Sequence, residues 1–218
     1  MPFNMVGTVE AVHIGCIAPL GPYATPSAFG KRAAADRVLV SKLGLAGDEQ
    51  ADLKVHGGPD KAVYAYPIEN YPSWIAAFPA NAHTLIAGGM GENLVTSGLD
   101  EHTVRIGDIH RIGSAILQVT QPRQPCFKLG LFHDAPKMVR HMTKTGLSGW
   151  YLRVLQAGEI GRGDRIELSE QAPLGWTVHR FALVTARKEI ASEVLTEIAA
   201  MPGLAENWRL RAFRRLSE

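Results

Sequence analysis

The sequence of 218 residues predicts a mainly β domain that is followed by a small helical subdomain. Short runs of alternating apolar and polar residues, separated by glycine and proline turns, fill the first two-thirds of the chain. This pattern is typical of a closed or partly closed β structure. After Glu170 the apolar residues change to helical spacing. We therefore expect a β domain over residues 1–170 and a helical subdomain over residues 171–218.

The expected strands follow one another along the first domain. They lie in the stretches VGTVEAV, DRVLVSKLGL, TVRIGDIHRIG, SAILQVTQP and GRGDRIEL. The third stretch predicts two strands around a turn at Gly107 and Asp108. Two helices are expected between the strands, one around Trp74 and one in DAPKMVRHMTKTG, where Met138 and Met142 share a helix face.

The second domain begins after QAPLG, a linker by composition. Apolar residues recur at helical spacing in ARKEIASEVLTEIAAM and again in LAENWRLRAFRRLSE, with a break at Pro202-Gly203. The last stretch also carries four arginines, Arg209, Arg211, Arg214 and Arg215. A solvated helix face explains them better than a patch for nucleic acid or a protein partner.

The composition excludes several classes of protein. A net charge of +2 is too small for a general polyanion binder, so we expect no nucleic-acid partner. The N-terminus lacks the pattern of a signal peptide, and no run of about 18 apolar residues predicts a membrane span. We therefore expect a cytoplasmic protein with free thiols, and a disulfide between Cys16 and Cys126 ranks low. The oligomeric state is left open, a homodimer included.

The stretch QVTQPRQPCFKLG places Cys126 at the end of a strand, behind two prolines and between Arg123 and Lys128. A thiolate is a soft metal ligand, and nearby cations favour the thiolate form. Free cysteine is equally often a small buried apolar residue, so the motif alone leaves both interpretations open. A structural zinc site needs about four ligands in close pairs, and the chain has no C-x-x-C or H-E-x-x-H. A single thiolate instead points to a cofactor that brings its own ligands.

A second polar segment, GLAGDEQADLKVHGGPDKAVYAYP, is too polar for a core strand. Its glycines flank Asp48, His56, Asp60 and Lys61 and would let backbone amides approach a ligand closely. A long surface loop is the alternative, and for each residue taken singly it is the better one.

Two further segments carry residues of interest. GGMGENLVTSGL has neither the P-loop lysine nor the G-x-G-x-x-G spacing, so a nucleotide loop is not indicated. Asn93 in this segment could read a heterocycle edge or simply cap a turn. Lys31 in TPSAFGK is a solvated lysine unless it meets a phosphate.

Taken together, these segments resemble the MOSC-domain family (molybdenum cofactor sulfurase C-terminal domain), in particular its short bacterial YiiM-like members. The resemblance rests on the order of GLAGDEQADLKVHGGPDKAVYAYP, GENL, VRIGDIHRIGSAILQVTQPRQPCFKL and GRGDRIEL, within a motif-bearing part over residues 28–168. It implies a MOSC-type β-barrel with a few helices and a C-terminal three-helix subdomain. It also implies a molybdenum cofactor whose pterin dithiolene holds the metal.

The resemblance assigns roles to particular residues. Cys126 would be the metal ligand and a catalytic residue. Cofactor-binding positions would be Lys31, His56, Asn93, Arg123 and Gln124. In addition, we expect His56 or Asp60 to supply protons.

The resemblance further implies reduction of N-hydroxylated small molecules, such as 6-hydroxylaminopurine and amidoximes, to amines or amidines. Because the chain has no flavin or iron–sulfur motif, a flavoprotein reductase is the expected electron donor. The main alternative is a non-catalytic carrier of the cofactor or of a sulfur atom on Cys126. A cysteine hydrolase with His56 as base ranks lowest.

Overall fold

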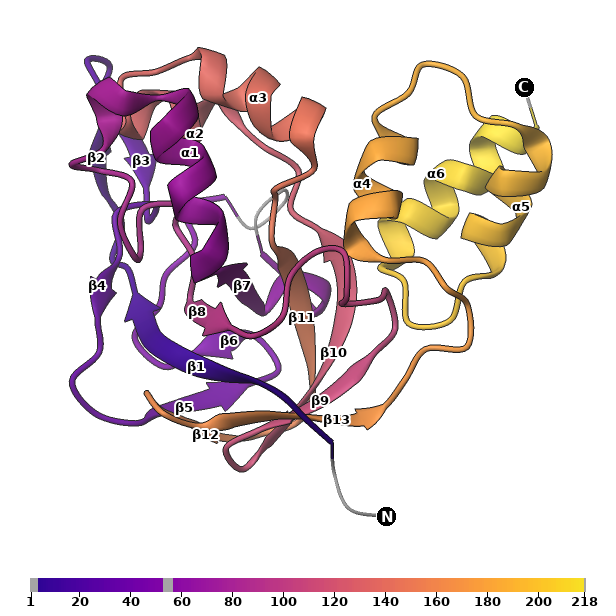
Figure 1. Ribbon diagram of the computed structural model, residues 1–218, viewed down its shortest axis with the longest axis horizontal. Helices are drawn as coiled ribbons and strands as arrows, with labels where there is room; N and C mark the ends of the chain where they lie inside the picture. The colour runs from indigo at the N-terminus through magenta and orange to yellow at the C-terminus, as the bar shows by residue number, and fades with distance from the viewer. Residues whose placement is uncertain (1–3, 53–56, 218) are drawn as a thin grey trace.

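The computed structural model describes residues 4–52 and 57–217, which form a closed β-barrel flanked by helices (Figure 1). The barrel strands are β1 (Asn4–Ile14), β7 (Val63–Pro67), β8 (Leu94–Ser97), β9 (Ile109–Ile112), β10 (Ala115–Pro122), β11 (Trp150–Gln156) and β13 (Arg165–Glu170). Their order is β13-β9-β10-β11-β7-β8-β1, and a pairing of β13 with β1 closes the ring. Neighbours are antiparallel except for the parallel pair β7 and β8. The prediction of a mainly β barrel is confirmed.

Strand β1 bends to take part in the closure. It pairs with β13 at its start and with β8 further along, and its register shifts between Met5 and Gly7 and again between Val9 and Ala11. A Cβ atom at Gly7 would lie 2.4 Å from the Ser97 carbonyl oxygen, so only glycine fits at this crossing.

Shorter strands extend the barrel at its edges. They are β2 (Ala18–Leu20), β3 (Thr25–Ser27), β4 (Arg32–Ala33), β5 (Val38–Ser41), β6 (Gly44–Leu45) and β12 (Gly158–Ile160). β4 pairs with β1, β2 pairs with β3, and β5 lies between β12 and β6. The stretch DRVLVSKLGL contains both β5 and β6, so it forms two short strands.

One group of helices covers the end of the barrel near β2 and β3 (Figure 1). It comprises α1 (Tyr71–Ala77), α2 (Phe127–Phe132) and α3 (Lys137–Thr145), with the 3₁₀ turns η2 (Ile68–Asn70) and η3 (Pro79–Asn81) next to α1. The 3₁₀ turn η1 (Pro59–Lys61) lies instead beside β10 and β11. The expected helices around Trp74 and through Met138 and Met142 are present, and all three side chains are fully buried in one core cluster.

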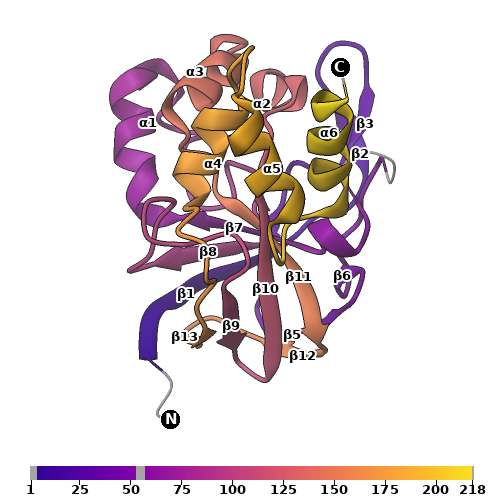
Figure 2. The ribbon, with the colours of Figure 1, turned by 90° about the vertical axis from the view of Figure 1, so that its right-hand side faces the viewer.

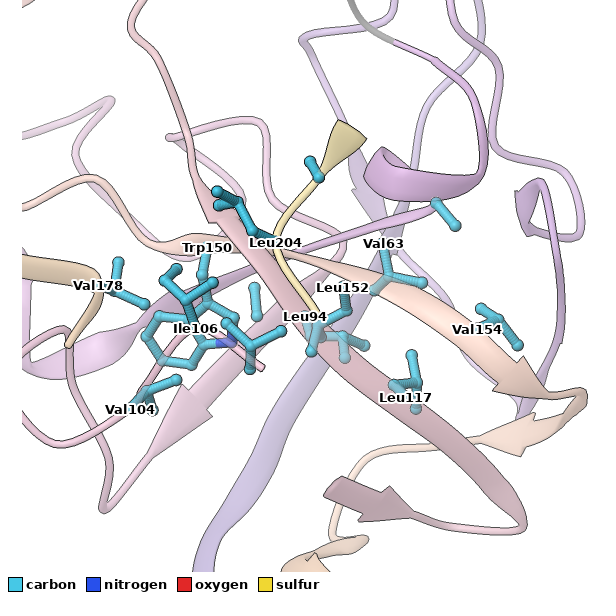
Figure 3. Close-up of a cluster of buried hydrophobic side chains, with 14 of the residues drawn as sticks. Val63, Leu94, Val104, Ile106, Leu117, Trp150, Leu152, Val154, Val178 and Leu204 are labelled. Carbon is cyan, nitrogen blue, oxygen red and sulfur yellow. The ribbon is translucent and has the colours of Figure 1, made fainter. Parts of the chain in front are cut away.

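The C-terminal helices are α4 (Val178–Thr185), α5 (Ser192–Ala200) and α6 (Glu206–Leu216). Figure 2 shows them gathered on one side of the barrel, beside β10. Thr177 caps α4, because its hydroxyl accepts a hydrogen bond from the Arg180 N–H. Val178 and Leu204 lie in the same buried cluster as Ile106 and Trp150 of the barrel (Figure 3). The helices and the barrel therefore share one continuous hydrophobic core.

Three local expectations differ from the structure. The first arm of TVRIGDIHRIG is not a strand, since only Arg105 forms an isolated bridge, with Thr177. The stretch VYAYP, expected within a polar loop, is the fully buried strand β7. Its residues face packed groups on both sides, so the period-2 alternation of a half-exposed strand is missing. Cys126 does not end a strand, because β10 stops at Pro122 and Cys126 is the N-cap residue of α2.

Asp60 connects the barrel to the helical subdomain. Its carboxylate accepts hydrogen bonds from Arg153 Nε at 2.8 Å and from the Glu206 N–H at 3.0 Å, and Glu206 is the first residue of α6. The backbone oxygen of Asp60 accepts from the Thr120 hydroxyl at 2.7 Å. Asp60 thus satisfies a free N–H group at the start of α6 from a distant part of the chain.

Replacing Asp60 by alanine removes this cap and the partner of Arg153. We expect the free energy of unfolding to fall by about 1 kcal/mol, the usual cost of a lost cap. Urea denaturation followed by circular dichroism measures the loss, with the exposed residue substitution Asp36→Ala as control. Equal stability of the two variants would refute the structural role of Asp60.

His110 gives the fold a specific pH dependence. It is 2% exposed on β9, and burial lowers its pKa to about 4. The unfolded chain binds this proton near the ordinary value of about 6.5. Below that pH the unfolded state therefore takes up the proton first, and stability falls as the pH drops from about 6.5 to about 4.

We expect His110 to account for roughly 3 kcal/mol of the stability lost over this range, since one pKa unit corresponds to about 1.4 kcal/mol. In His110→Gln this part of the pH dependence should disappear, while the exposed His83→Gln should behave like the unmodified chain. Unfolding curves at pH 7, 5.5 and 4 test this, and parallel pH profiles for the chain with and without His110 would contradict it.

Candidate functional site

One cavity gathers most of the residues that the sequence singled out. It is open to solvent. Its walls come from the β3–β4 connection, the segment after β6, the start of β7 and β8, the β10–α2 connection and β11. Lys31, Asn93, Arg123 and Cys126 all line it.

Cys126 lies on the wall formed by the β10–α2 connection. It is half-buried, and its backbone is extended where it caps α2. The two cysteines form no disulfide, and Cys16 is exposed outside this cavity lining. The Cys126 thiol interacts electrostatically with Arg123. Cys126 is thus a cavity thiol beside a fixed cation rather than a packed apolar residue.

Arg123 is held rigidly in the cavity wall. It is 7% exposed, and its guanidinium lies 5.1 Å from the Phe29 ring centroid and 4.8 Å from that of Tyr64. Its Nη1 donates to the Met90 carbonyl oxygen. Burial alone would lower the pKa of Arg123, but the hydroxyl groups of Tyr64 and Tyr151 outweigh it and raise this pKa. The guanidinium therefore stays charged inside the protein.

Glu92 holds the loop that receives Arg123. It is fully buried, and its carboxylate accepts from the Gly88 N–H at 2.7 Å, the Met90 N–H at 3.0 Å and the Tyr71 hydroxyl. Burial raises the pKa of Glu92, while these donors oppose the shift. The GEN motif thus shapes a turn whose Met90 carbonyl points at the guanidinium.

Lys31 forms an ion pair with Asp48, and the two side chains are 7% and 2% exposed. Burial lowers the pKa of Lys31, and the Asp48 charge works against this shift. Each charge of this buried pair stabilises the other, because removal of either partner would leave an unpaired charge away from water. Lys31 is therefore not the solvated lysine that its local sequence suggests.

The Asn93 amide is already used within the protein. Its Nδ2 donates to Asp48 Oδ2 at 2.9 Å and to the His13 carbonyl oxygen at 3.2 Å, and its Oδ1 accepts from the Tyr64 N–H at 3.0 Å. Both donor hydrogens are engaged, so Asn93 cannot also donate to a heterocycle without giving up one of these bonds. It positions its neighbours instead.

Two predicted site residues, Asp60 and Gln124, do not line the cavity. Asp60 faces Arg153 and α6, although its charge raises the pKa of the cavity residue Lys61, which burial lowers overall. Gln124 is exposed and lines a separate hollow on the other side of its loop, between α3 and α4. His56 lies outside the described residues.

The cavity also contains residues that sequence reasoning did not assign to it. These are Asp48, Tyr64, Lys61, Lys128 and Tyr151. Asp48 and Lys61 stood in the segment already marked as polar and glycine-rich, so only their partners were missing. Tyr64 and Tyr151 are adjacent on the paired strands β7 and β11, a register that no local pattern reveals.

Two further findings concern metal-binding clusters and membrane-spanning helices. Within the described residues no group of three or more His, Cys, Asp or Glu side chains could hold a metal ion. None of the helices in residues 4–52 and 57–217 has the length and apolar character of a membrane span.

Comparison with known proteins agrees with this architecture. The family model of the MOSC domain matches residues 52–167. Protein YiiM of Escherichia coli (strain K12) is 38% identical over 197 residues, covering 90% of this chain and 88% of that protein. A protein named Reductase from Gibberella moniliformis is 37% identical over 166 residues, covering 76% of this chain but 29% of that protein.

Solved structures show the same fold. YiiM from Geobacillus stearothermophilus superimposes with a TM-score of 0.82 at 30% identity, covering 96% of this chain and 99% of that chain. YiiM from Escherichia coli gives a TM-score of 0.78 at 31% identity, with 93% of each chain covered. Because the family model matches more than half of the chain and the identity to YiiM extends over most of it, this chain belongs to the MOSC-domain family.

Proposed function

We propose that this protein binds the molybdenum cofactor and reduces N-hydroxylated substrates, such as 6-hydroxylaminopurine and amidoximes, to amines or amidines. The observation that carries the proposal is that Cys126 lines one cavity together with Arg123 and Lys31. MOSC domains are associated with binding of the molybdenum cofactor, and one relative is named a reductase.

The residues present fit such a cofactor. It combines a soft metal centre with a planar pterin and an anionic phosphate. Cys126 offers a soft sulfur ligand, and Arg123 offers a permanently charged, planar donor suited to phosphate. The chain supplies one thiol to a metal whose remaining ligands would come with the cofactor.

Each residue then has a specific task. Cys126 would hold the metal, and Arg123, fixed between Phe29 and Tyr64, would bind the phosphate without further reorganisation. The bound cofactor would supply the electron transfer itself. The overall reaction is R–NHOH + 2e⁻ + 2H⁺ → R–NH₂ + H₂O, so an external donor must provide the electrons. A flavoprotein reductase remains our proposed partner.

The two protons are better supplied by cavity lysines than by Asp60. Asp60 is engaged by Arg153 and by α6, away from the cavity lining. Burial lowers the pKa of both Lys31 and Lys61, so each gives up a proton more readily than an exposed lysine does.

The alternative is a carrier that holds the cofactor, or a sulfur atom on Cys126, for delivery to another protein. The half-buried position of Cys126 in an open cavity is compatible with that role as well. A carrier and a reductase differ in turnover.

The first prediction concerns metal retention. Protein produced in a host that makes the cofactor should contain molybdenum. The molybdenum content of Cys126→Ser should be lower by about tenfold or more, because the metal loses its protein ligand. Cys16→Ser is the matched control, since it removes the other, exposed thiol. Metal analysis by mass spectrometry measures the content, and equal molybdenum in the two variants would show that Cys126 is not the ligand.

The second prediction separates reductase from carrier. With dithionite as electron source, cofactor-loaded protein should convert many equivalents of 6-hydroxylaminopurine to the amine, measured by liquid chromatography. Cys16→Ser should do the same, and Cys126→Ser should not. A loaded protein that binds molybdenum but forms at most one equivalent of product would be a carrier, and the reductase proposal would fail.

A further inference from the structure

Asp48 is a buried charged group that contacts three other parts of the cavity wall. Its side chain is 2% exposed and lies after β6. One carboxylate oxygen accepts from the Lys31 ammonium and from the Gly15 N–H at 2.8 Å. The other accepts from Asn93 Nδ2 at 2.9 Å. This single carboxylate therefore joins the end of β1, the β3–β4 connection and the start of β8.

The backbone around Asp48 is built for this close approach. A Cβ atom at Gly15 would lie 2.7 Å from the Ala28 carbonyl oxygen and 3.0 Å from Lys31 Cγ. Glycine at this position lets the aliphatic part of Lys31 pass directly over the strand end. The Gly15 N–H then remains free to donate to the carboxylate that pairs with the ammonium.

Several charged groups face Lys31 from the surrounding elements. Asp48 and Glu92 favour its charged form, and Arg123 opposes it. His13 on β1 also feels the Lys31 charge, which together with burial lowers the pKa of His13. Among these groups Asp48 is the one whose carboxylate contacts the ammonium and has the largest opposing effect on the burial penalty.

We propose that Asp48 is a positioning residue, which holds the Lys31 ammonium charged and in place at the cavity wall and locks the Asn93 amide behind it. Lys31 then meets the anionic part of a ligand or passes a proton to it, while Asn93 acts through Asp48 and the backbone of β1 and β7. The use of Lys31 for a ligand rests on the proposed function, but the coupling between Asp48 and Lys31 does not.

The test compares two neighbouring acids that both line the cavity, Asp48 and Glu49. Glu49 accepts from the Ile17 N–H at 2.6 Å, and its substitution Glu49→Gln removes the same charge one residue away. The pH profile of Lys31 acetylation by acetic anhydride, followed by peptide mass spectrometry, reports the deprotonated fraction of the amine. The midpoint of the profile, rather than the absolute rate, measures titration, so altered access alone does not mimic the effect.

We expect the midpoint to move to lower pH in Asp48→Asn, with Lys31 reacting about tenfold faster on the rising part of the profile. In Glu49→Gln the midpoint should stay at its original position. Binding of inorganic phosphate, measured by calorimetry, should weaken with rising pH earlier in Asp48→Asn than in Glu49→Gln. An unchanged midpoint in Asp48→Asn, or an equal shift in both variants, would overturn the proposal.

A second pair of variants keeps the proposal testable if Asp48→Asn folds poorly. Poor folding is a risk because this substitution leaves a buried ammonium without its partner. The double variant Asp48→Asn/Lys31→Met removes both charges and should bind phosphate as weakly as Lys31→Met alone, because Asp48 acts through Lys31. A further loss in the double variant would mean that Asp48 acts on the ligand by another route. Since none of these readouts needs turnover, failure of the reductase proposal would leave them unaffected.

Discussion

The course of β1, which closes the barrel against β13 and then pairs with β8, is the constraint on which the cavity depends. The same strand continues past the closure to pair with β8, where Val12 lies opposite Leu94. This places Gly15, just beyond β1, close to Asn93, just before β8. The parallel pairing of β7 with β8 then adds Tyr64, whose N–H is bound by Asn93. These three chain segments meet because β8 pairs with both β1 and β7.

Several polar groups in the cavity wall and directly behind it make their hydrogen bonds within the protein. Glu92, Asn93 and Arg123 are all nearly inaccessible to water, and each has several partners. A buried polar group without such partners would cost about 1–3 kcal/mol, so the network holds each group in one arrangement. The ligand-facing surface is thus set before anything binds. Less buried cations at the rim, such as Lys128, complete the positive side of the cavity.

The sequence predicts what depends on local pattern. Alternation along β1 and β10, helical spacing in α5 and α6 and the polar segment containing Asp48 all appear where expected. It does not predict what depends on distant contacts. Asp60 meets Arg153 and Glu206, which lie 93 and 146 residues further along the chain. A carboxylate in a glycine-rich loop looks equally suited to catalysis or to capping until those partners are seen.

The assignment of Asn93 shows the same limit. Its position in the GEN motif correctly marks the cavity, but the motif cannot tell that the amide is saturated by Asp48, His13 and Tyr64. Strand β7 was missed for a different reason, since a strand buried on both faces lacks alternation. Motif order thus locates the site, and tertiary contacts decide which of its members remain available.

The shared core of the barrel and the C-terminal helices has an evolutionary consequence. Val178 and Leu204 are buried in the same cluster as Ile106 and Trp150. A relative that lost these helices would have to replace several aliphatic and aromatic residues of its barrel at once, because any single substitution would leave the rest of the apolar surface exposed. Acquisition or loss of this appendage therefore requires coordinated substitutions, and lineages with and without it should remain distinct.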